Sequence, residues 1–191
     1  KADKSFWLIA SVLFVILLAL YLVIAFLIHK IEKKNITISE QNRSLEKLSA
    51  TDPLTGLLNR YGTRSPAESF INVAVRHSEG LSLILMDVDH FKEINDQYGH
   101  AAGDYALREV AGILKRHQRT SDLVSRWGGE EFLVTLPKTT LDNSVLTAER
   151  IRLGLESYQF EFAEQKLKVT ASFGVASLLP DESFDDLIRR A

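Results

Sequence analysis

The chain of 191 residues contains no cysteine, which excludes disulfide bonds, zinc sites built on thiolates and cysteine nucleophiles. It also lacks a strong excess of one charge, since its formal net charge is −2. Residues 1–50 hold seven Lys and Arg against four Asp and Glu, so residues 51–191 carry −5. Because a broad nucleic-acid surface needs clustered basic side chains, we expect no nucleic-acid partner. The only methionine is Met86, which indicates a piece of a longer protein.

One run of the chain has no charge at all. Residues 6–28 contain 23 consecutive uncharged side chains, and only Ser11 and Tyr21 are appreciably polar. A helix of this length measures about 34 Å and can cross a bilayer core of about 30 Å. A secretory signal peptide has a shorter apolar core of about 7–15 residues. We therefore expect a membrane anchor within residues 1–28, and the basic residues that follow it place the C-terminal side in the cytoplasm.

Residues 29–50 form a polar stretch without glycine or proline. Ile24, Ile31, Ile38 and Leu45 recur every seven residues, which is typical of a coiled coil, but half of the companion positions are polar. A weak dimeric coiled coil and a solvated linker helix are therefore both compatible with this segment. In either case we expect the helix to end at Pro53.

Residues 51–191 show a mixed pattern of strands and helices. Apolar runs and periodicity predict strands at 81–88, 122–127, 130–136 and 168–173, and helices at 104–119 and 142–158. Gly128-Gly129 is a two-residue hairpin signal, and Ser183 opens a capping box before a last helix. The order βαββαβ predicts an α+β, ferredoxin-like domain with an antiparallel sheet and its helices on one face.

Two acidic pairs stand at expected strand ends. Asp87 and Asp89 close an apolar strand, where a charge is costly unless it is paired or bound to a metal, although Asp also commonly starts turns. Glu130 and Glu131 follow Gly128-Gly129, whose missing side chains let a phosphate approach the backbone. Together the pairs suggest an oxygen-rich Mg²⁺ site, whereas each alone is compatible with a solvated turn.

The segment after the first acidic pair adds polar groups of a different kind. If a helix begins at Phe91, its free N–H groups and Lys92 form a cradle for phosphate. Asn95 and Asp104 have the donors and acceptors to read a guanine edge, and they are equally suited to cap helices.

At this point a family resemblance becomes visible in six successive blocks. The blocks are Asp52–Arg60, Asp87–Asp96, Tyr98–His100, Gly103–Asp104, Arg126–Phe132 and Ser172–Ala176. In this order they resemble the signatures of GGDEF-domain diguanylate cyclases and cover nearly all of residues 51–191. The resemblance implies a palm-type fold, akin to class III nucleotide cyclases, that condenses two GTP into cyclic di-GMP and releases pyrophosphate.

The resemblance also assigns roles to individual residues. It implies that Asp87, the Val88 carbonyl and Glu130, supported by Glu131, hold two Mg²⁺ ions, with Mn²⁺ as a possible substitute. Glu130 matches the proposed base for the ribose 3′-hydroxyl, and Lys92 matches the group that stabilises phosphate charge. The positions that correspond to substrate contacts are Phe91, Lys92, Asn95, Asp104, Gly128 and Gly129.

Regulation and assembly follow from the same resemblance. Each subunit of such an enzyme holds one GTP, so a homodimer is implied, beneath a sensor at the bacterial inner membrane. Arg119 and Asp122 match the family's RxxD site for inhibition by cyclic di-GMP, although a solvated helix end has the same pattern. The alternative function is a catalytically inactive module that serves as a receptor for GTP or cyclic di-GMP.

Three features depart from the family pattern. Glu130 stands where the family more often has Asp, a variant that active members use. Gly62 and Pro66 interrupt a stretch that is usually helical, so we expect it to be irregular. The sequence also stops at Ala191, before the family's closing helix and strand, which predicts a domain truncated at its C-terminus.

Overall fold

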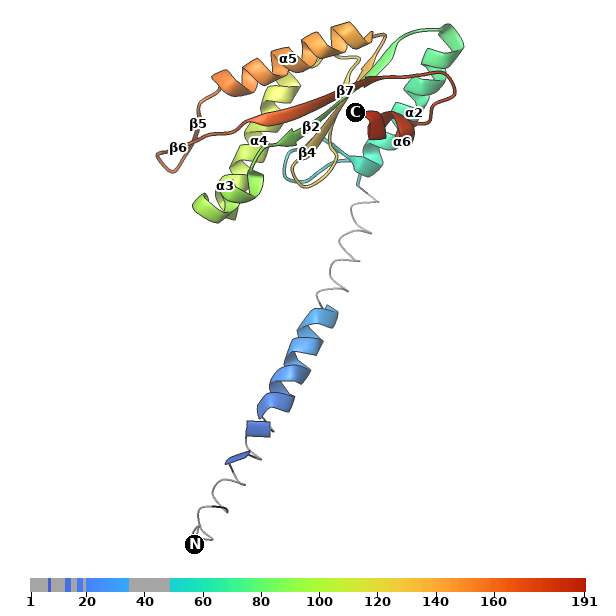
Figure 1. The fold of residues 1–191 in the computed structure, drawn as a ribbon. Coiled ribbons are helices and arrows are strands. Elements are labelled where there is room, and N and C mark those ends of the chain that lie inside the picture. The colour runs from blue at the N-terminus through green and yellow to red at the C-terminus, as the bar shows by residue number, and fades with distance from the viewer. Residues whose placement is uncertain (1–6, 8–12, 15–16, 19, 35–48) are drawn as a thin grey trace. The chain divides into compact units, whose positions relative to one another are not determined.

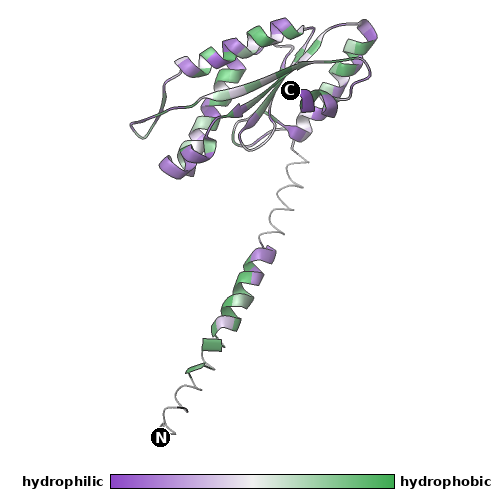
Figure 2. Cartoon of the chain, in the orientation of Figure 1, coloured by the Kyte–Doolittle hydropathy of each residue, from purple (hydrophilic) through white to green (hydrophobic). Residues whose placement is uncertain are grey.

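The computed structural model describes residues 7, 13–14, 17–18, 20–34 and 49–191 (Figure 1). Their contacts divide the chain into two units, residues 1–45 and 46–191. In the first unit, residues 20–34 are helical, and their apolar side chains are exposed. This stretch is mostly hydrophobic and becomes hydrophilic toward residue 34 (Figure 2).

The predicted membrane anchor and linker fall largely on the first unit. Several residues of the run 6–28, and residues 35–48 of the linker, lie outside the described part of the chain. Among the residues that are described, no helix combines the length and the hydropathy needed to span a bilayer. The anchor and the coiled coil therefore stay predictions.

The second unit is built on a five-stranded sheet in the order β1-β3-β4-β2-β7. The strands are β1 (Leu58–Asn59), β2 (Leu81–Val88), β3 (Leu123–Arg126), β4 (Glu131–Pro137) and β7 (Ala171–Ser177). Neighbouring strands from β3 to β7 are antiparallel, as predicted, but β1 pairs with β3 in parallel, so the sheet is mixed. The strand 81–88 has the predicted bounds because its apolar run is buried on both faces.

Helices cover both faces of this sheet, which corrects the expectation of helices on one face. They are α2 (Arg60–His77), α3 (Phe91–Tyr98), α4 (His100–His117), α5 (Leu141–Ser157) and α6 (Phe184–Arg190). Helices α4 and α5 lie on one face of the sheet, and α2 and α6 lie on the other (Figure 1). Ile84 and Met86 of β2 belong to the core cluster that contains residues of α4 and α5, whereas Leu83 and Leu85 belong to the cluster that contains residues of α2 and α6. The second layer was missed because α2 lacks a strong apolar stripe.

Helix α2 runs without interruption through Gly62 and Pro66, so the predicted irregular segment is wrong. Asn59 caps the helix by accepting from the Gly62 N–H at 2.8 Å. A Cβ on Gly62 would stand 2.0 Å from the Ala50 carbonyl oxygen, so this glycine permits a close backbone approach. Burial of Thr63 and Ala67 against the sheet compensates for the hydrogen bond that Pro66 removes.

The C-terminal third differs from prediction in its strands. A small hairpin, β5 (Phe160–Phe162) with β6 (Gln165–Leu167), occupies a stretch for which no strands were predicted. The strand expected at 168–173 is β7, which begins at Ala171 and ends at Ser177. The capping box is confirmed, because Ser183 accepts from the Asp186 N–H and α6 follows directly.

Candidate active site

Four predicted site residues lie together at one end of the central strand pair. Asp87 is the penultimate residue of β2, and its Cα partner is Glu131, the first residue of β4. The pairing continues one step further, since the Val88 N–H donates to the Glu130 carbonyl at 3.2 Å. The register therefore brings Asp87, Val88, Glu130 and Glu131 to the same end of the sheet.

The Val88 carbonyl points toward the Glu130 loop. The next N–H, of Asp89, donates to the Thr170 carbonyl at 2.9 Å on the opposite side, toward β7. In a trans peptide the C=O and the following N–H point in opposite directions, so the Val88 carbonyl faces away from β7. No turn, loop or side-chain donor among the described residues bonds to this carbonyl, which leaves an oxygen available to a ligand.

The Gly128-Gly129 turn is longer than the predicted two-residue hairpin. Trp127 and Gly128 both donate from their N–H groups to the Glu131 carbonyl, at 2.8 and 3.2 Å, and Glu130 remains in the loop. Neither glycine has the positive φ that a type I′ turn requires. A Cβ on Gly128 would lie 2.2 Å from the Glu131 carboxylate, whereas one on Gly129 would meet open space.

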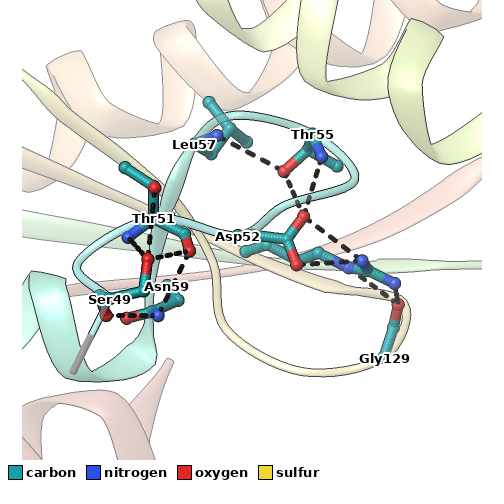
Figure 3. Close-up of polar contacts among 8 residues, drawn as sticks. Ser49, Thr51, Asp52, Thr55, Leu57, Asn59 and Gly129 are labelled. Atoms are coloured by element: carbon teal, nitrogen blue, oxygen red, sulfur yellow. Dashed lines mark hydrogen bonds and ion pairs between the residues drawn. The ribbon is translucent and has the colours of Figure 1, made fainter. Parts of the chain in front are cut away.

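Arg126 connects this loop to Asp52, and Figure 3 shows Asp52 and Gly129, the two residues that it bonds. Its Nε and Nη2 donate to the Gly129 carbonyl at 3.2 and 2.6 Å, and its Nη1 donates to both Asp52 oxygens at 3.3 and 3.1 Å. Asp52 also accepts from the Thr55 hydroxyl at 2.6 Å and the Thr55 N–H at 2.8 Å. The start of the domain is thereby tied to the acidic loop.

The pKa of Asp52 reflects this bonding. Burial alone would raise it, but the hydrogen bonds from Thr55 and the charge and hydrogen bonds of Arg126 outweigh burial and lower the pKa below 3.8. The side chains of Arg126 and Asp52 are only 17% and 15% exposed, so water screens their attraction weakly. No role for this pair was predicted, because 74 residues separate the two side chains and no local pattern connects them.

Helix α3 begins three residues after β2 ends. His90, with φ 55°, makes the turn, and the helix starts at Phe91 without a side-chain cap. The N–H groups of Glu93 and Ile94 donate to the His90 carbonyl, but those of Phe91 and Lys92 have no acceptor among the described residues. Two free N–H groups and the exposed Lys92 therefore lie at the helix N-terminus, an arrangement suited to binding phosphate.

Asn95 and Asp104 do not cap helices, so that alternative is wrong. Asn95 lies inside α3, Asp104 lies inside α4, and Gly99 occupies the junction between these helices. Asn95 lies directly against α4, because a Cβ on Gly103 would stand 2.1 Å from the Asn95 Oδ1. The absence of a side chain at Gly103 thus lets the Asn95 amide lie beside the residue that precedes Asp104.

The polar side chains of the site share one property. In the described part of the chain, none of them makes a side-chain hydrogen bond or ion pair; these are Asp87, Lys92, Glu130, Glu131, Asn95 and Asp104. Polar groups left without protein partners are available to a ligand. The pKa of Asp87 is raised by partial desolvation at the strand end and then by the nearby Asp89 carboxylate.

The oxygen donors fit a hard divalent cation. Carboxylates at Asp87 and Glu130 and the unbonded Val88 carbonyl are ligand types that Mg²⁺ prefers. Within the residues described, no three His, Asp or Glu side chains are grouped closely enough to hold a metal by themselves. A cation here would therefore need the backbone carbonyl and further oxygens from substrate or water.

The predicted inhibitory pair lies at the other end of the strands. Arg119 is exposed and lines a cavity of about 610 Å³ together with Leu81 and Pro137, where β2 begins and β4 ends. Asp122 is 7% exposed and accepts from the Arg119 N–H at 2.7 Å and from the Ser121 hydroxyl at 3.2 Å. The arginine is available to a ligand, whereas the aspartate is used within its own turn.

Comparison with known proteins identifies the family. Residues 49–191 match the model described as diguanylate cyclase, GGDEF domain. The chain is 41% identical over 143 residues to diguanylate cyclase DgcP of Pseudomonas aeruginosa, covering 74% of this chain and 21% of that protein. It spans less than half the length of the curated relatives that it matches here, with 21%, 43% and 37% of three of them covered.

Two solved structures have the same fold. The GGDEF domain of DgcB from Caulobacter crescentus, in complex with c-di-GMP, is 32% identical with a TM-score of 0.72, over 74% of this chain and 82% of that one. The active GGEEF domain of a diguanylate cyclase from Vibrio cholerae is 34% identical with a TM-score of 0.66, over 70% and 85%. The chain described above belongs to the family of GGDEF diguanylate cyclase domains.

Proposed function

We propose that this chain synthesises cyclic di-GMP from two molecules of GTP. The observation that carries the proposal is the set of unpaired polar groups at the ends of β2 and β4 and on α3 and α4. They combine oxygen donors for a cation, a cradle for phosphate and a polar pair for a base. Diguanylate cyclases such as DgcP, and an active domain with the same GGEEF sequence, support the proposal.

Different residues of this chain would bind the cations, the phosphates and the guanine. Asp87, the Val88 carbonyl and Glu130, supported by Glu131, would hold divalent cations, which neutralise phosphate charge when bound. Lys92 and the free N–H groups of Phe91 and Lys92 bind the phosphates, and Gly129, which faces open space, lets them approach the loop. Asn95 and Asp104 hold the guanine.

The reaction makes and breaks one bond at each of two phosphorus atoms. Glu130 accepts the proton from the 3′-hydroxyl of one GTP, whose oxygen bonds to the α-phosphorus of the other, and pyrophosphate leaves from that phosphorus. A second, identical step closes the ring. Because one site holds one GTP, two copies of the chain face each other during the reaction.

The test is a product assay on the purified chain with GTP and Mg²⁺, with Glu130→Gln as its matched variant. We expect one cyclic di-GMP and two pyrophosphates for two GTP consumed. Loss of a general base lowers rates by about 100- to 10,000-fold, and the variant should keep its dimeric state. GTP binding without product in the wild-type dimer would instead support a receptor function and contradict synthesis.

We also propose that the product inhibits the enzyme through Arg119. Its exposed guanidinium beside a cavity supports this role. Arg119→Ala is the informative variant, because Asp122→Ala would also remove a buried turn contact. Inhibition by added cyclic di-GMP should weaken in Arg119→Ala while the uninhibited rate is kept. Unchanged inhibition would exclude this site.

A membrane anchor in residues 1–28 is a further proposal, with the domain on the cytoplasmic side of a bacterial inner membrane. The uncharged sequence and the exposed apolar side chains of the described helix support it, among them Leu22, Ile24 and Phe26. The chain should sediment with membranes and be released by detergent. Release by high salt alone would contradict insertion.

A further inference from the structure

Asp89 differs from its neighbour Asp87 in how fully it is bonded. Its Oδ2 accepts from the Thr170 hydroxyl at 2.8 Å, and its Oδ1 accepts from the Ser172 hydroxyl at 2.7 Å. Its backbone N–H donates to the Thr170 carbonyl at 2.9 Å. Three hydrogen bonds thus connect Asp89, the residue that follows β2, to residues 170–172, where β7 begins. Asp87, two residues earlier, has no such partner among the described residues.

These bonds fix the peptide that carries the Val88 carbonyl. On the β4 side, the Val88 N–H donates to the Glu130 carbonyl. On the β7 side, Asp89 is bonded to Thr170 and Ser172. With both sides held, the peptide between Val88 and Asp89 cannot rotate without losing hydrogen bonds. The carbonyl is therefore kept pointing at the Glu130 loop.

The same anchor precedes the first turn of α3. His90, the residue after Asp89, adopts φ 55°, and the helix with Lys92 in its first turn follows at once. A non-glycine residue in this region is kept there by its surroundings. Asp89 supplies a fixed point one residue before that turn, so it also sets where the free N–H groups of Phe91 and Lys92 lie.

We propose that Asp89 is a positioning residue, which acts through the Thr170 and Ser172 hydroxyls to aim the Val88 carbonyl and the first turn of α3 at the bound cation and phosphates. It does not touch metal or substrate. The inference rests on the proposed function for the identity of the site. Turning this carboxylate toward a cation would break both hydroxyl bonds, whereas Asp87 is free to ligate without losing any.

The test removes the anchor from each side separately. Asp89→Ala removes the acceptor, and the double variant Thr170→Val/Ser172→Ala removes the donors but leaves the carboxylate in place. Asp89→Asn keeps one carbonyl oxygen as an acceptor for a hydroxyl. Asp87→Ala serves as the reference for loss of a direct ligand, and Ser157→Ala, an exposed hydroxyl on α5, serves as the control for removing a surface hydroxyl.

Binding of Mn²⁺ in the presence of a non-hydrolysable GTP analogue, followed by electron paramagnetic resonance, is the readout. We expect Asp89→Ala and the double variant to weaken Mn²⁺ binding by the same factor, about tenfold, the lower end of what outer-shell partners of a metal contribute. Asp89→Asn should lose less Mn²⁺ affinity than Asp89→Ala, and Ser157→Ala should bind Mn²⁺ like wild type. Asp87→Ala should not bind Mn²⁺ at all. In turnover assays, the Mg²⁺ concentration for half-maximal rate should be unchanged in Ser157→Ala, higher in Asp89→Asn, and higher still in Asp89→Ala and the double variant.

Two results would overturn the inference. If Asp89→Ala abolishes Mn²⁺ binding as Asp87→Ala does, while the double variant binds like wild type, Asp89 is a direct ligand. If both anchor variants bind Mn²⁺ like wild type and only lower the melting temperature, the anchor serves stability alone. A wild-type chain that binds Mn²⁺ and analogue but makes no product would contradict cyclase activity, and the inference would still be decided by binding.

Discussion

Two carboxylates beside the same loop show opposite behaviour. Asp52 receives hydrogen bonds from Thr55 and Arg126, which lower its pKa although burial opposes this. The Asp87 carboxylate has no hydrogen-bond or ion-pair partner among the described residues, and desolvation followed by the Asp89 charge raises its pKa. The first arrangement stabilises the ionised group and so the fold, whereas the second leaves an exposed carboxylate that a cation can bind without breaking a protein contact. Bonding state, more than residue type, thus separates scaffold from site.

The strongest test of this contrast is neutralisation of Asp87. Asp87→Asn should lower cyclic di-GMP synthesis more than about 100-fold, since even outer-shell partners of a metal are worth about 10- to 100-fold. It should not lower stability. A folded-state pKa raised above 3.8 means that the ionised group opposes folding, so at pH 7 the variant should melt at the same or a higher temperature.

The pH dependence gives the control for Asp87. Any excess in the melting temperature of Asp87→Asn over wild type should shrink as the pH falls through the raised pKa toward 3.8, because the wild-type carboxyl then becomes neutral as well. A variant that melts well below wild type at pH 7 would mean that Asp87 belongs to the scaffold.

The scaffold side is tested by Arg126→Ala. This change frees the Gly129 carbonyl and leaves the largely buried Asp52 carboxylate without its cation, at a cost of about 1–3 kcal/mol in the free energy of unfolding. Misplacement of the loop should lower turnover by about 10- to 100-fold. Denaturant unfolding and the GTP assay measure the two effects, and combination with Asp52→Asn should show that the stability losses are not additive.

Gly103→Ala tests a residue that belongs to the scaffold but borders the candidate site, because this glycine makes room for the Asn95 amide. We expect the KM for GTP to rise about tenfold, equivalent to about 1.4 kcal/mol, and the preference for GTP over ATP to fall. Gly112→Ala in the same helix is the matched control, since its Cβ would lie 3.4 Å from the flexible Arg116 side chain. Equal effects of both changes would contradict a role for Gly103 at the base.

The smallest expected effect is that of Asp52→Asn on stability against pH. A folded-state pKa below 3.8 makes the ionised group stabilising at pH 7, and this contribution is lost as the pH falls below 3.8. The variant should therefore unfold more easily than wild type at pH 7, with a difference in unfolding free energy that narrows as the pH falls from 7 to below 3.8. A constant difference across this range would mean that Thr55 and Arg126 do not stabilise the charge.

How far the sequence predicts this molecule depends on the range of the interactions. Local patterns were sufficient for β2, for the cores of α4 and α5, and for the Ser183 cap, because burial and capping there repeat over a few residues. They failed for α2, where contact with Ala50 explains Gly62 and burial offsets Pro66. The mixed sheet also depends on β1, a strand of two residues that gives no periodic signal.

The candidate site shows the same limit. The motif blocks predicted which residues gather at the ends of β2 and β4, and the register confirms that Asp87, Val88, Glu130 and Glu131 meet there. Residue type and position alone did not separate Asp87 from Asp89, and only the family resemblance assigned the metal to Asp87. Their difference comes from Thr170 and Ser172, which follow more than 80 residues later and approach only through the β2/β7 pairing.

A crystal structure of the chain with Mn²⁺ and a non-hydrolysable GTP analogue tests the central claim most directly. We expect an anomalous peak for Mn²⁺ bound by Asp87, the Val88 carbonyl and Glu130, phosphates at the start of α3, and Asp89 still bonded to Thr170 and Ser172. A metal bound by Asp89, or an analogue held away from the unpaired side chains, would contradict it.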